Sequence, residues 1–378
     1  HSFPTRRSSD LYHPRFDKSA FPYEILSESE AKSFLKNDTA FDWIILHHVI
    51  PDLFIRFPKC YNLGYFVWET DKPPSNCNWE AHFDNLDGLW VSSEFLVGVV
   101  RNLGWTKPVH VVPWPVSTKS LTRQVPNNSK LKIYRVNVKK ISSISLKEFM
   151  ELELDFLFSV LSDAPRKALP VLISEWINYK MISQRGKSLL LKISTFNYSK
   201  SDKIIIKECQ EFLKHACGGE RLKDAGIFVI SENLSENELR YFYDSCQAFV
   251  TATVGEGFGG PIAEAALLGK PVISPRHSSL EFLLPADYPL VVPHEGVTLS
   301  QGPNSFYAVS SKWGLTKAGA LSEKLIQLDL MKSKDLVKLG NTIKNFVFEV
   351  CNPRKVKLSM EKFLKNEVRA IRQICNRR

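Results

Sequence analysis

Two glutamates stand eight positions apart on either side of a glycine-rich segment, in the stretch Glu256-Gly-Phe-Gly-Gly-Pro-Ile-Ala-Glu264. The apolar, β-branched residues 248–254 before it predict a buried strand. The glycines allow a tight turn and the close approach of a ligand. We expect a short helix with Pro261 at its first position, followed by the helix-forming run 262–268, and with Gly269 just beyond its end.

The charges at the start of the helix determine which ligand groups this strand, loop and helix could bind. A helix N-terminus offers unpaired N–H groups and a partial positive charge, which attract phosphate. The carboxylate of Glu256 would compete with a phosphate there unless it binds a neutral group. Sugar hydroxyls meet that need, because each donates a hydrogen bond worth about 1.5–3 kcal/mol to a carboxylate. The segment therefore predicts a site for a diphosphate and a sugar; a surface turn with two solvated acids is the alternative.

The region around the segment predicts an α/β domain with a doubly wound parallel sheet, over residues 151–335. Strands are expected near Phe156, Leu189, Phe228, Ala248 and Val272, with helices between them. Right-handed crossovers then place the carboxyl ends of the strands along one edge. Residues 255–260 and 165–167 both follow strands, so both are expected at that edge. Lys192, which ends the run 188–192, is expected there too.

The rest of the chain predicts a second, shorter α/β domain and a helical end. We expect an N-terminal domain over residues 11–116 and a polar, basic linker or insertion over 117–150. C-terminal helices follow over 336–378, the last with a basic face. That face carries five cations: Lys357, Lys362, Lys365, Arg369 and Arg372. Packing against the body of the protein is the main expectation for this helix, and contact with a membrane surface is the alternative.

Composition narrows the class of protein. The chain has 378 residues and a formal net charge of +10, which suits anionic partners such as a nucleotide sugar or a charged membrane face. No nucleic-acid-binding motif is present, so we expect no nucleic-acid partner. The seven cysteines form no metal-binding spacing, which predicts reduced thiols in a cytoplasmic protein. Residues 1–10 show no pattern, and we expect them to be a non-native leader.

Residues 256–264 resemble the E-x7-E motif of retaining glycosyltransferases with the GT-B fold, of the group 1 or family 4 class. From about Asp42 onward, further segments resemble that class: 68–74, 90–93, 111–113, 156–160, 165–167, 228–231 and 234–243. The resemblance implies two Rossmann-like domains with a cleft between them. The family's opening strand and glycine loop are not found before Asp42, so we expect the first domain to be incomplete at its N-terminus.

The resemblance also implies an activity. A sugar, hexose-like in the family, would pass from a nucleotide-diphosphate sugar to a glycan or lipid-linked acceptor with retention, as in polysaccharide biosynthesis. The Asp-x-Asp motif of metal-dependent glycosyltransferases is not present, and the family implies neither a metal nor a cofactor besides the donor. Nothing in the sequence stands out as a nucleophile, so the leaving phosphate is expected to act as the base.

The donor-binding residues follow from the matching positions. Glu264 is expected to bond the ribose hydroxyls, with a helix-surface acid as the alternative. Glu256 is expected to bond hydroxyls of the transferred sugar. Arg166 and Lys167 should neutralise the diphosphate, since charge builds on the leaving phosphate; a solvated basic turn is the alternative. The remaining donor-binding candidates are Lys192 and the backbone N–H groups of Gly257, Phe258, Gly259 and Gly260.

In the first domain, Glu69 is the best candidate to line the cleft, where it would orient the acceptor hydroxyl or the donor sugar; a structural carboxylate that caps a turn is the alternative. The chief rival function is a non-catalytic or truncated relative that binds a nucleotide or glycan without turnover. Leu161 favours it, because the family commonly has arginine there. A sugar-nucleotide epimerase of the same fold is a second rival. We expect Glu256→Ala to abolish transfer with little change in melting temperature.

Overall fold

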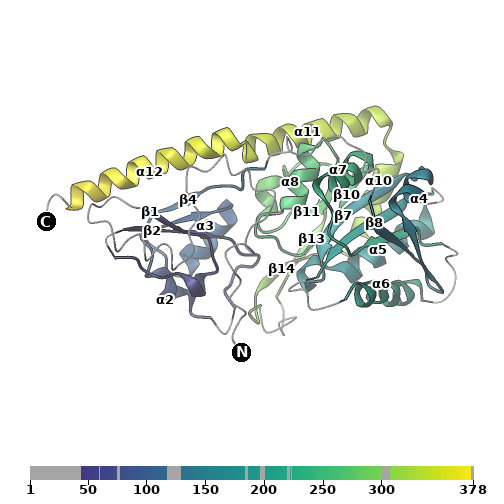
Figure 1. Ribbon diagram of the computed structural model, residues 1–378, viewed down its shortest axis with the longest axis horizontal. Helices are drawn as coiled ribbons and strands as arrows, with labels where there is room; N and C mark the ends of the chain where they lie inside the picture. The colour runs from purple at the N-terminus through teal and green to yellow at the C-terminus, as the bar shows by residue number, and fades with distance from the viewer. Residues whose placement is uncertain are drawn as a thin grey trace. The chain divides into compact units, whose positions relative to one another are not determined.

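The structure is a computed structural model, and it describes residues 44–58, 60–74, 77–116, 129–183, 186–195, 201–218, 222, 224–298 and 307–375, of which 368–375 by backbone alone. The predictions about residues 1–10 and about the missing opening strand lie outside this part, as do the side chains of Arg369 and Arg372. Two compact units are present. The first contains residues 44–68, 77–116 and 349–375 and the second contains 69–74 and 129–348, within the described ranges (Figure 1).

The first unit is built on a parallel sheet whose strands follow one another in chain order. They are β1 (Ile44–His47), β2 (Tyr61–Phe66), β3 (Gly88–Val91) and β4 (Val109–Val111). The connections contain η3 (Pro51–Leu53), α2 (Trp79–Phe83) and α3 (Glu94–Asn102). With strands in chain order, right-handed crossovers put all three connections on the same face of the sheet. The opposite face needs another cover.

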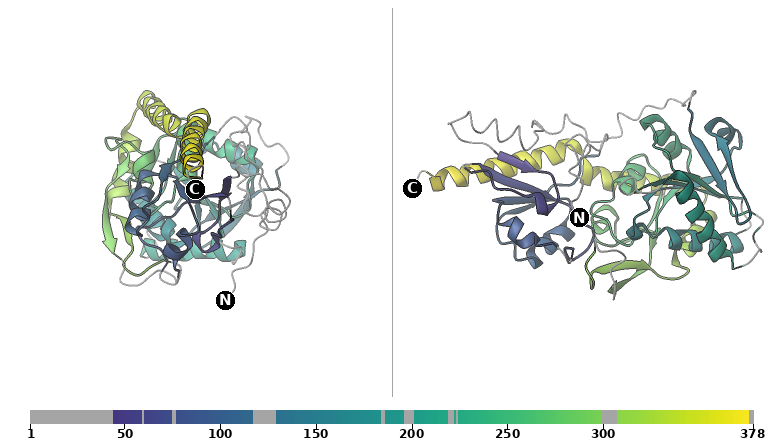
Figure 2. Two further views of the ribbon diagram at one scale, coloured as in Figure 1. Left: turned by 90° about the vertical axis from the view of Figure 1, so that its left-hand side faces the viewer. Right: turned by 60° about the horizontal axis from the view of Figure 1, so that its bottom comes forward.

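Helix α12 (Pro353–Cys375) supplies that cover (Figure 2). Its inward residues Val356, Met360 and Phe363 recur at helical spacing and are buried against the sheet. Their partners on the strands point to one side because side chains alternate along a strand. These partners are Tyr61, Leu63, Tyr65, Trp90 and Val112.

The second unit is built on an eight-stranded sheet of order β12-β11-β10-β7-β8-β9-β5-β6. The six strands from β12 to β9 are parallel, β5 runs antiparallel to β9, and β6 runs antiparallel to β5. The five predicted strands are all present: β7 (Phe156–Ser162), β8 (Ser188–Ser194), β9 (Ile227–Ile230), β10 (Ala248–Val250) and β11 (Val272–Pro275). The chain builds outward from β7 through β8 to β9, then returns to place β10 on the other side of β7. This reversal is the topological switch point of a doubly wound sheet.

The segment expected to be a linker or insertion carries part of this sheet. Its described portion forms β5 (Lys132–Val136), β6 (Ile141–Ser145) and α4 (Leu146–Glu151). Ile133 and Val136 are buried where β5 pairs with β9. The hairpin therefore belongs to the second unit. Of its two strands, only β6 lies at the edge of the sheet, with β5 between it and β9. The two strands bury few side chains, so their sequences give a weak strand signal.

The helices and short strands complete the second unit. They are α5 (Leu169–Ile182), α6 (Asp202–Cys217), α7 (Glu236–Ser245), α8 (Gly260–Leu267), α9 (Leu280–Leu283), α10 (Ala320–Leu330), β12 (Val291–Val292), β13 (His294–Thr298) and β14 (Lys312–Thr316); α11 (Ser333–Cys351) follows. Helix α8 begins at Gly260, so Pro261 is its second residue and not its first. Gly269 follows the end of α8 at φ 77°, as predicted for a residue in the left-handed region.

Candidate functional site

The candidate site lies at the switch point of the second unit. The 3-10 helix η4 (Pro165–Lys167) follows β7, and the glycine segment 255–260 follows β10. Because β7 and β10 are parallel neighbours, their carboxyl ends lie side by side. Open α/β sheets bind ligands at this point, outside the carboxyl ends of the strands where the strand order reverses. The sheet therefore brings Arg166 and Lys167 to Glu256.

The carboxylate of Glu256 is held by both cations. Its Oε2 accepts a hydrogen bond of 2.9 Å from Arg166 Nη1, and its Oε1 accepts one from Lys167 Nζ. The hydroxyl of Thr253 donates a third, of 2.9 Å. Arg166 Nε also lies 3.2 Å from the carboxylate of Glu69. We call Glu69, Arg166, Lys167, Thr253 and Glu256 the Glu256 cluster.

Burial and charge set the ionisation of the cluster. Burial alone would raise the pKa of Glu256, which is only 6% exposed, but Lys167 and Arg166 lower it to about 2. Burial lowers the pKa of Lys167, and Glu256 opposes that effect. The pKa of Arg166 is raised because Glu69 and Glu256 outweigh its burial. Two cations therefore face two carboxylates, and a solvated basic turn is ruled out for residues 166 and 167.

The low pKa of Glu256 predicts an acid-sensitive contribution to stability. Lowering the pKa from 4.5 to about 2 corresponds to about 3 kcal/mol. The stabilisation is complete above the unfolded pKa of 4.5 and is lost as the pH falls toward 2, because the unfolded chain then binds the extra proton. We expect the wild type to lose about 3 kcal/mol more than Glu256→Gln between about pH 5 and pH 2. Urea unfolding at several pH values measures this, and equal losses in both proteins would contradict the ion-pair geometry.

Glu69 reaches the cluster through a strap, residues 69–74, that belongs to the second unit although it follows β2 of the first. Asp71 Oδ1 accepts a 2.6 Å hydrogen bond from the backbone N–H of Lys312. Lys72 Nζ donates one of 2.8 Å to Ser310 Oγ. The structure thus places the predicted acceptor-side residue directly against the predicted donor-side cations.

Gly255 allows the strap to lie against the glycine segment. A Cβ at this position would stand 2.7 Å from the backbone oxygen of Glu69, closer than such atoms approach. Gly255→Ala should therefore displace the strap and cost about 1–3 kcal/mol of folding stability. Gly98→Ala is the matched control, because Gly98 is exposed in α3 with nothing within 4 Å of its added Cβ; we expect it to stabilise by about 0.5–1 kcal/mol. Thermal unfolding of both variants measures the difference, and an unchanged stability of the Gly255→Ala variant would contradict the close contact.

The glycine segment is fixed by the residues that follow β11. Ser278 Oγ accepts a 2.8 Å hydrogen bond from the backbone N–H of Glu256, and Ser279 Oγ donates one of 2.8 Å to the oxygen of Gly257. Gly259 has φ 96°, and a Cβ there would stand 2.6 Å from Leu280 Cδ2. Gly257 to Gly260, including the buried Phe258, thus lead into the first turn of α8. Their expected role as N–H donors to a ligand stays a prediction.

The other two predicted residues lie farther along the same motif and the same edge. Glu264 is buried in α8, where its Oε2 accepts a 3.0 Å hydrogen bond from the hydroxyl of Tyr243. It is therefore not a helix-surface acid, and the alternative of two solvated acids fails at both positions. Lys192 is buried in β8, and its Nζ lies 3.1 Å from Ser194 Oγ and 3.4 Å from the oxygen of Ser231. These partners place Lys192 at the carboxyl ends of β8 and β9.

Three residues at the site escaped the sequence analysis. Thr253 donates to Glu256, Ser278 holds its backbone, and Tyr307 accepts a hydrogen bond from Arg166. The pKa of Tyr307 is raised, first by burial and then by Glu69. Thr253 lies three residues before Glu256, so its position next to the motif was a usable signal. Tyr307 lies far along the chain from Arg166 and follows no motif, so the sequence offered none.

The described helices and metal-ligating side chains bear on two of the expectations, those about a membrane and about a metal ion. None of the described helices is both long and apolar enough to cross a membrane. In the same part of the chain, the side chains of His, Cys, Asp and Glu form no group of three that could hold a metal ion.

Comparisons with known proteins address the fold. No protein-family model matches the sequence, and no curated protein matches it either. Many solved structures are similar in fold, among them the following three. Sucrose-phosphate synthase from Thermosynechococcus elongatus has 16% identity and a TM-score of 0.60, covering 90% of this chain and 77% of that one. The UDP-forming α,α-trehalose-phosphate synthase from Burkholderia vietnamiensis has 10% identity and a TM-score of 0.59, covering 82% and 67%. Anabaena HepE, solved with UDP and glucose, has 12% identity and a TM-score of 0.54, covering 81% and 72%.

These similarities confirm the predicted fold. The chain is an α/β protein with parallel sheets and has the GT-B glycosyltransferase fold. Because the identities lie between 10% and 16%, the likeness concerns the fold alone. Membership of the group 1 or family 4 class, and the E-x7-E identity of residues 256–264, stay predictions.

Proposed function

We propose that the protein transfers a sugar from a nucleoside-diphosphate sugar to a hydroxyl of a glycan or lipid-linked acceptor, with retention. One observation carries the proposal: Arg166, Lys167 and Glu256 meet at the switch point of a GT-B second unit. A structural neighbour solved with UDP and glucose, and another named as UDP-forming, support a nucleotide sugar as donor. A role in polysaccharide synthesis accords with the family resemblance.

The cations supply the main chemical contribution in this proposal. Breaking the bond between the sugar and the diphosphate builds negative charge on the phosphate oxygens. Arg166 and Lys167 stabilise that charge from positions already fixed by η4, so they need no reorganisation during the reaction. The N–H groups at the start of α8 add a partial positive charge toward the same phosphates. The acceptor oxygen forms the new bond to the sugar carbon that the phosphate leaves, and the leaving phosphate takes the proton of the acceptor hydroxyl; no metal is required.

Glu256 must change partners when the donor binds. Its carboxylate already occupies Nη1 of Arg166 and Nζ of Lys167, the same donors that a diphosphate would use. A diphosphate carries more negative charge than one carboxylate, so it competes well for both cations. The displaced carboxylate is then free to accept hydrogen bonds from the sugar hydroxyls. Recognition of the sugar is thereby coupled to recognition of the diphosphate.

The other acids take the roles that their positions support. Glu264 lies about one helical turn beyond the start of α8, where it would bond the ribose hydroxyls after exchanging its bond with Tyr243. Glu69 holds Nε of Arg166 and would orient either the acceptor hydroxyl or this cation.

The direct test is a screen of UDP-, GDP- and ADP-sugars by thermal shift, followed by assay of nucleoside diphosphate release. We expect one nucleotide class to raise the melting temperature and to be released from its sugar. Binding without release under any donor and acceptor would favour a non-catalytic relative. Conversion of the donor sugar without an acceptor would favour an epimerase, and no binding of any nucleotide would contradict the proposal.

A further inference from the structure

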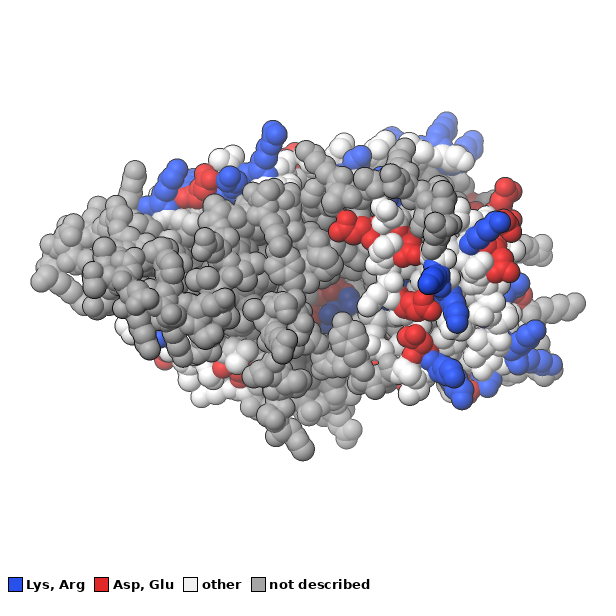
Figure 3. Space-filling model, viewed as in Figure 1, with Lys and Arg blue, Asp and Glu red and all other residues white. Residues whose placement is uncertain are grey.

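The outward face of α12 carries an exposed basic stripe. Arg354, Leu358, Lys362 and Lys365 follow one another at spacings of four, four and three, so they form one row along the helix. All four side chains are exposed, and Leu358 is 64% exposed between the cations. In Figure 3 basic side chains, with acidic atoms among them, project from the upper left edge, along which α12 runs in Figure 1.

The opposite face of α12 holds this row in place. Val356, Met360 and Phe363 are buried on the sheet of the first unit, and His110 Nε2 lies 2.8 Å from Ser359 Oγ. Among the described residues, Arg354, Lys362 and Lys365 make no side-chain hydrogen bond or ion pair. A fixed row of cations around an apolar side chain suits a surface that is anionic on the outside and apolar beneath.

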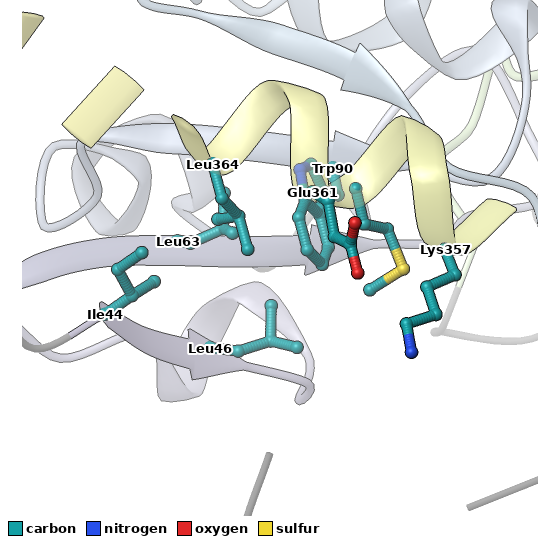
Figure 4. A pocket seen from close by; sticks show the side chains of 8 residues that line it. Ile44, Leu46, Leu63, Trp90, Lys357, Glu361 and Leu364 are labelled. Carbon is teal, nitrogen blue, oxygen red and sulfur yellow. The ribbon is translucent and has the colours of Figure 1, made fainter. Parts of the chain in front are cut away.

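An apolar cavity lies along one flank of the same helix. It has a volume of about 200 Å³. Figure 4 shows side chains of Ile44, Leu46 and Leu63 from the sheet facing Leu364 and Glu361 of α12, with Lys357 at one end. Dry apolar cavities of comparable size bind small hydrocarbons. The lining of the cavity contains one acidic side chain, Glu361, and one basic side chain, Lys357, which lies one helical turn before it. Their charges cancel, so this flank of the helix has no net charge.

We propose that α12 and this cavity form a binding site for an anionic lipid. The row Arg354, Lys362 and Lys365 contacts the headgroups, Leu358 inserts at the interface, and the cavity takes a short stretch of acyl chain. This inference is independent of the transferase proposal, because neither the row nor the cavity includes a residue of the Glu256 cluster. Nucleic acid is anionic too, but it has no acyl chain that could contact Leu358 and enter the apolar cavity, so a lipid surface is favoured.

The test is sedimentation of the full chain with phosphatidylcholine vesicles, with and without phosphatidylglycerol. We expect binding to the mixed vesicles only. The variant Arg354→Glu/Lys362→Glu/Lys365→Glu should weaken that binding by about a hundredfold, since each cation near an anionic surface contributes about 1 kcal/mol. Its matched control is Lys203→Glu/Lys207→Glu/Lys214→Glu on α6, an exposed helix that also presents Ile204 but has acids interspersed. The control changes net charge equally and should keep its binding within threefold, roughly.

The outcomes separate the alternatives. Equal losses in both triple variants would mean general charge attraction and would overturn the proposal, as would equal binding to vesicles without phosphatidylglycerol. A loss of duplex DNA binding without a loss of vesicle binding would point to nucleic acid. Lipids brominated on their acyl chains should quench the fluorescence of Trp90, which lines the cavity. If the Trp90→Phe variant is quenched as strongly as the wild type, the quenching comes from other tryptophans, and no acyl chain enters the cavity. Nucleoside diphosphate binding should be the same in all these variants.

Discussion

Replacing Glu256 with glutamine should lower sugar transfer by about two to three orders of magnitude and, at the same time, tighten binding of the free nucleoside diphosphate. Transfer falls because the carboxylate no longer accepts hydrogen bonds from the sugar. Diphosphate binding improves because Arg166 and Lys167 no longer have to be released from a charged partner. A residue that served only as a sugar ligand would leave diphosphate affinity unchanged. Titration calorimetry with the diphosphate and a transfer assay measure the two effects.

Glu264→Gln is the matched control for this result. Glu264 is a second buried acid of the same motif, and its carboxylate accepts a hydrogen bond from the hydroxyl of Tyr243. We expect this variant to bind the diphosphate no better than the wild type, and worse if Glu264 holds the ribose. Tighter diphosphate binding in both variants, or in neither, would contradict the exchange of partners at Glu256.

The structure also revises the expected stability of Glu256 variants. An alanine at this position was expected to leave the melting temperature nearly unchanged. Instead Glu256 is buried and pairs with two cations, and removing one member of a buried ion pair costs about 3–5 kcal/mol. For Glu256→Ala we therefore expect a loss of about 3–5 kcal/mol in place of a nearly unchanged melting temperature. A loss of stability does not make the residue merely structural, because a bound diphosphate should restore it by pairing with the freed cations.

Replacing both cations, as Arg166→Gln with Lys167→Met, should weaken diphosphate binding by about a hundredfold or more while nucleoside binding changes little. The reason is that both side chains act on the phosphates and neither is expected to touch the base or ribose. Calorimetry with the nucleoside, the monophosphate and the diphosphate gives the comparison. Equal losses for all three ligands would contradict the assigned role.

This double variant leaves Glu256 buried without a charge partner, so misfolding must be separated from loss of a ligand contact. Adding Glu256→Gln removes the last charge of the buried pairs and should recover much of the stability, since uncharged replacements of buried ion pairs are often neutral. The triple variant should fold and still fail to bind the diphosphate. Recovery of diphosphate affinity in the triple variant would show that the cations act on structure alone.

The sequence by itself determined the strands and the motif of the second unit. Continuous apolar runs at Phe156, Leu189 and Phe228 are long enough to identify buried strands, because a strand covered on both faces needs apolar side chains throughout. Gly269 marked the end of α8 because a residue in the left-handed region favours glycine. The hairpin of residues 132–145 has no such run, because its outer strand β6 exposes polar side chains and β5 buries only two of its five residues. The sequence therefore indicated a linker or insertion there.

Only the tertiary structure decided which charges meet. The sequence placed Arg166, Lys167 and Glu256 each after a strand, but the order of the strands made β7 and β10 neighbours and so joined them. The same holds for Glu69 and Tyr307, which approach Arg166 from distant parts of the chain. The sequence pattern of a segment reflects how that segment is buried. Ion pairs depend instead on the distances between segments, which a sequence pattern within one segment does not contain. For that reason the sequence identified the charged residues of the site, and the fold determined that Glu256 occupies both cations.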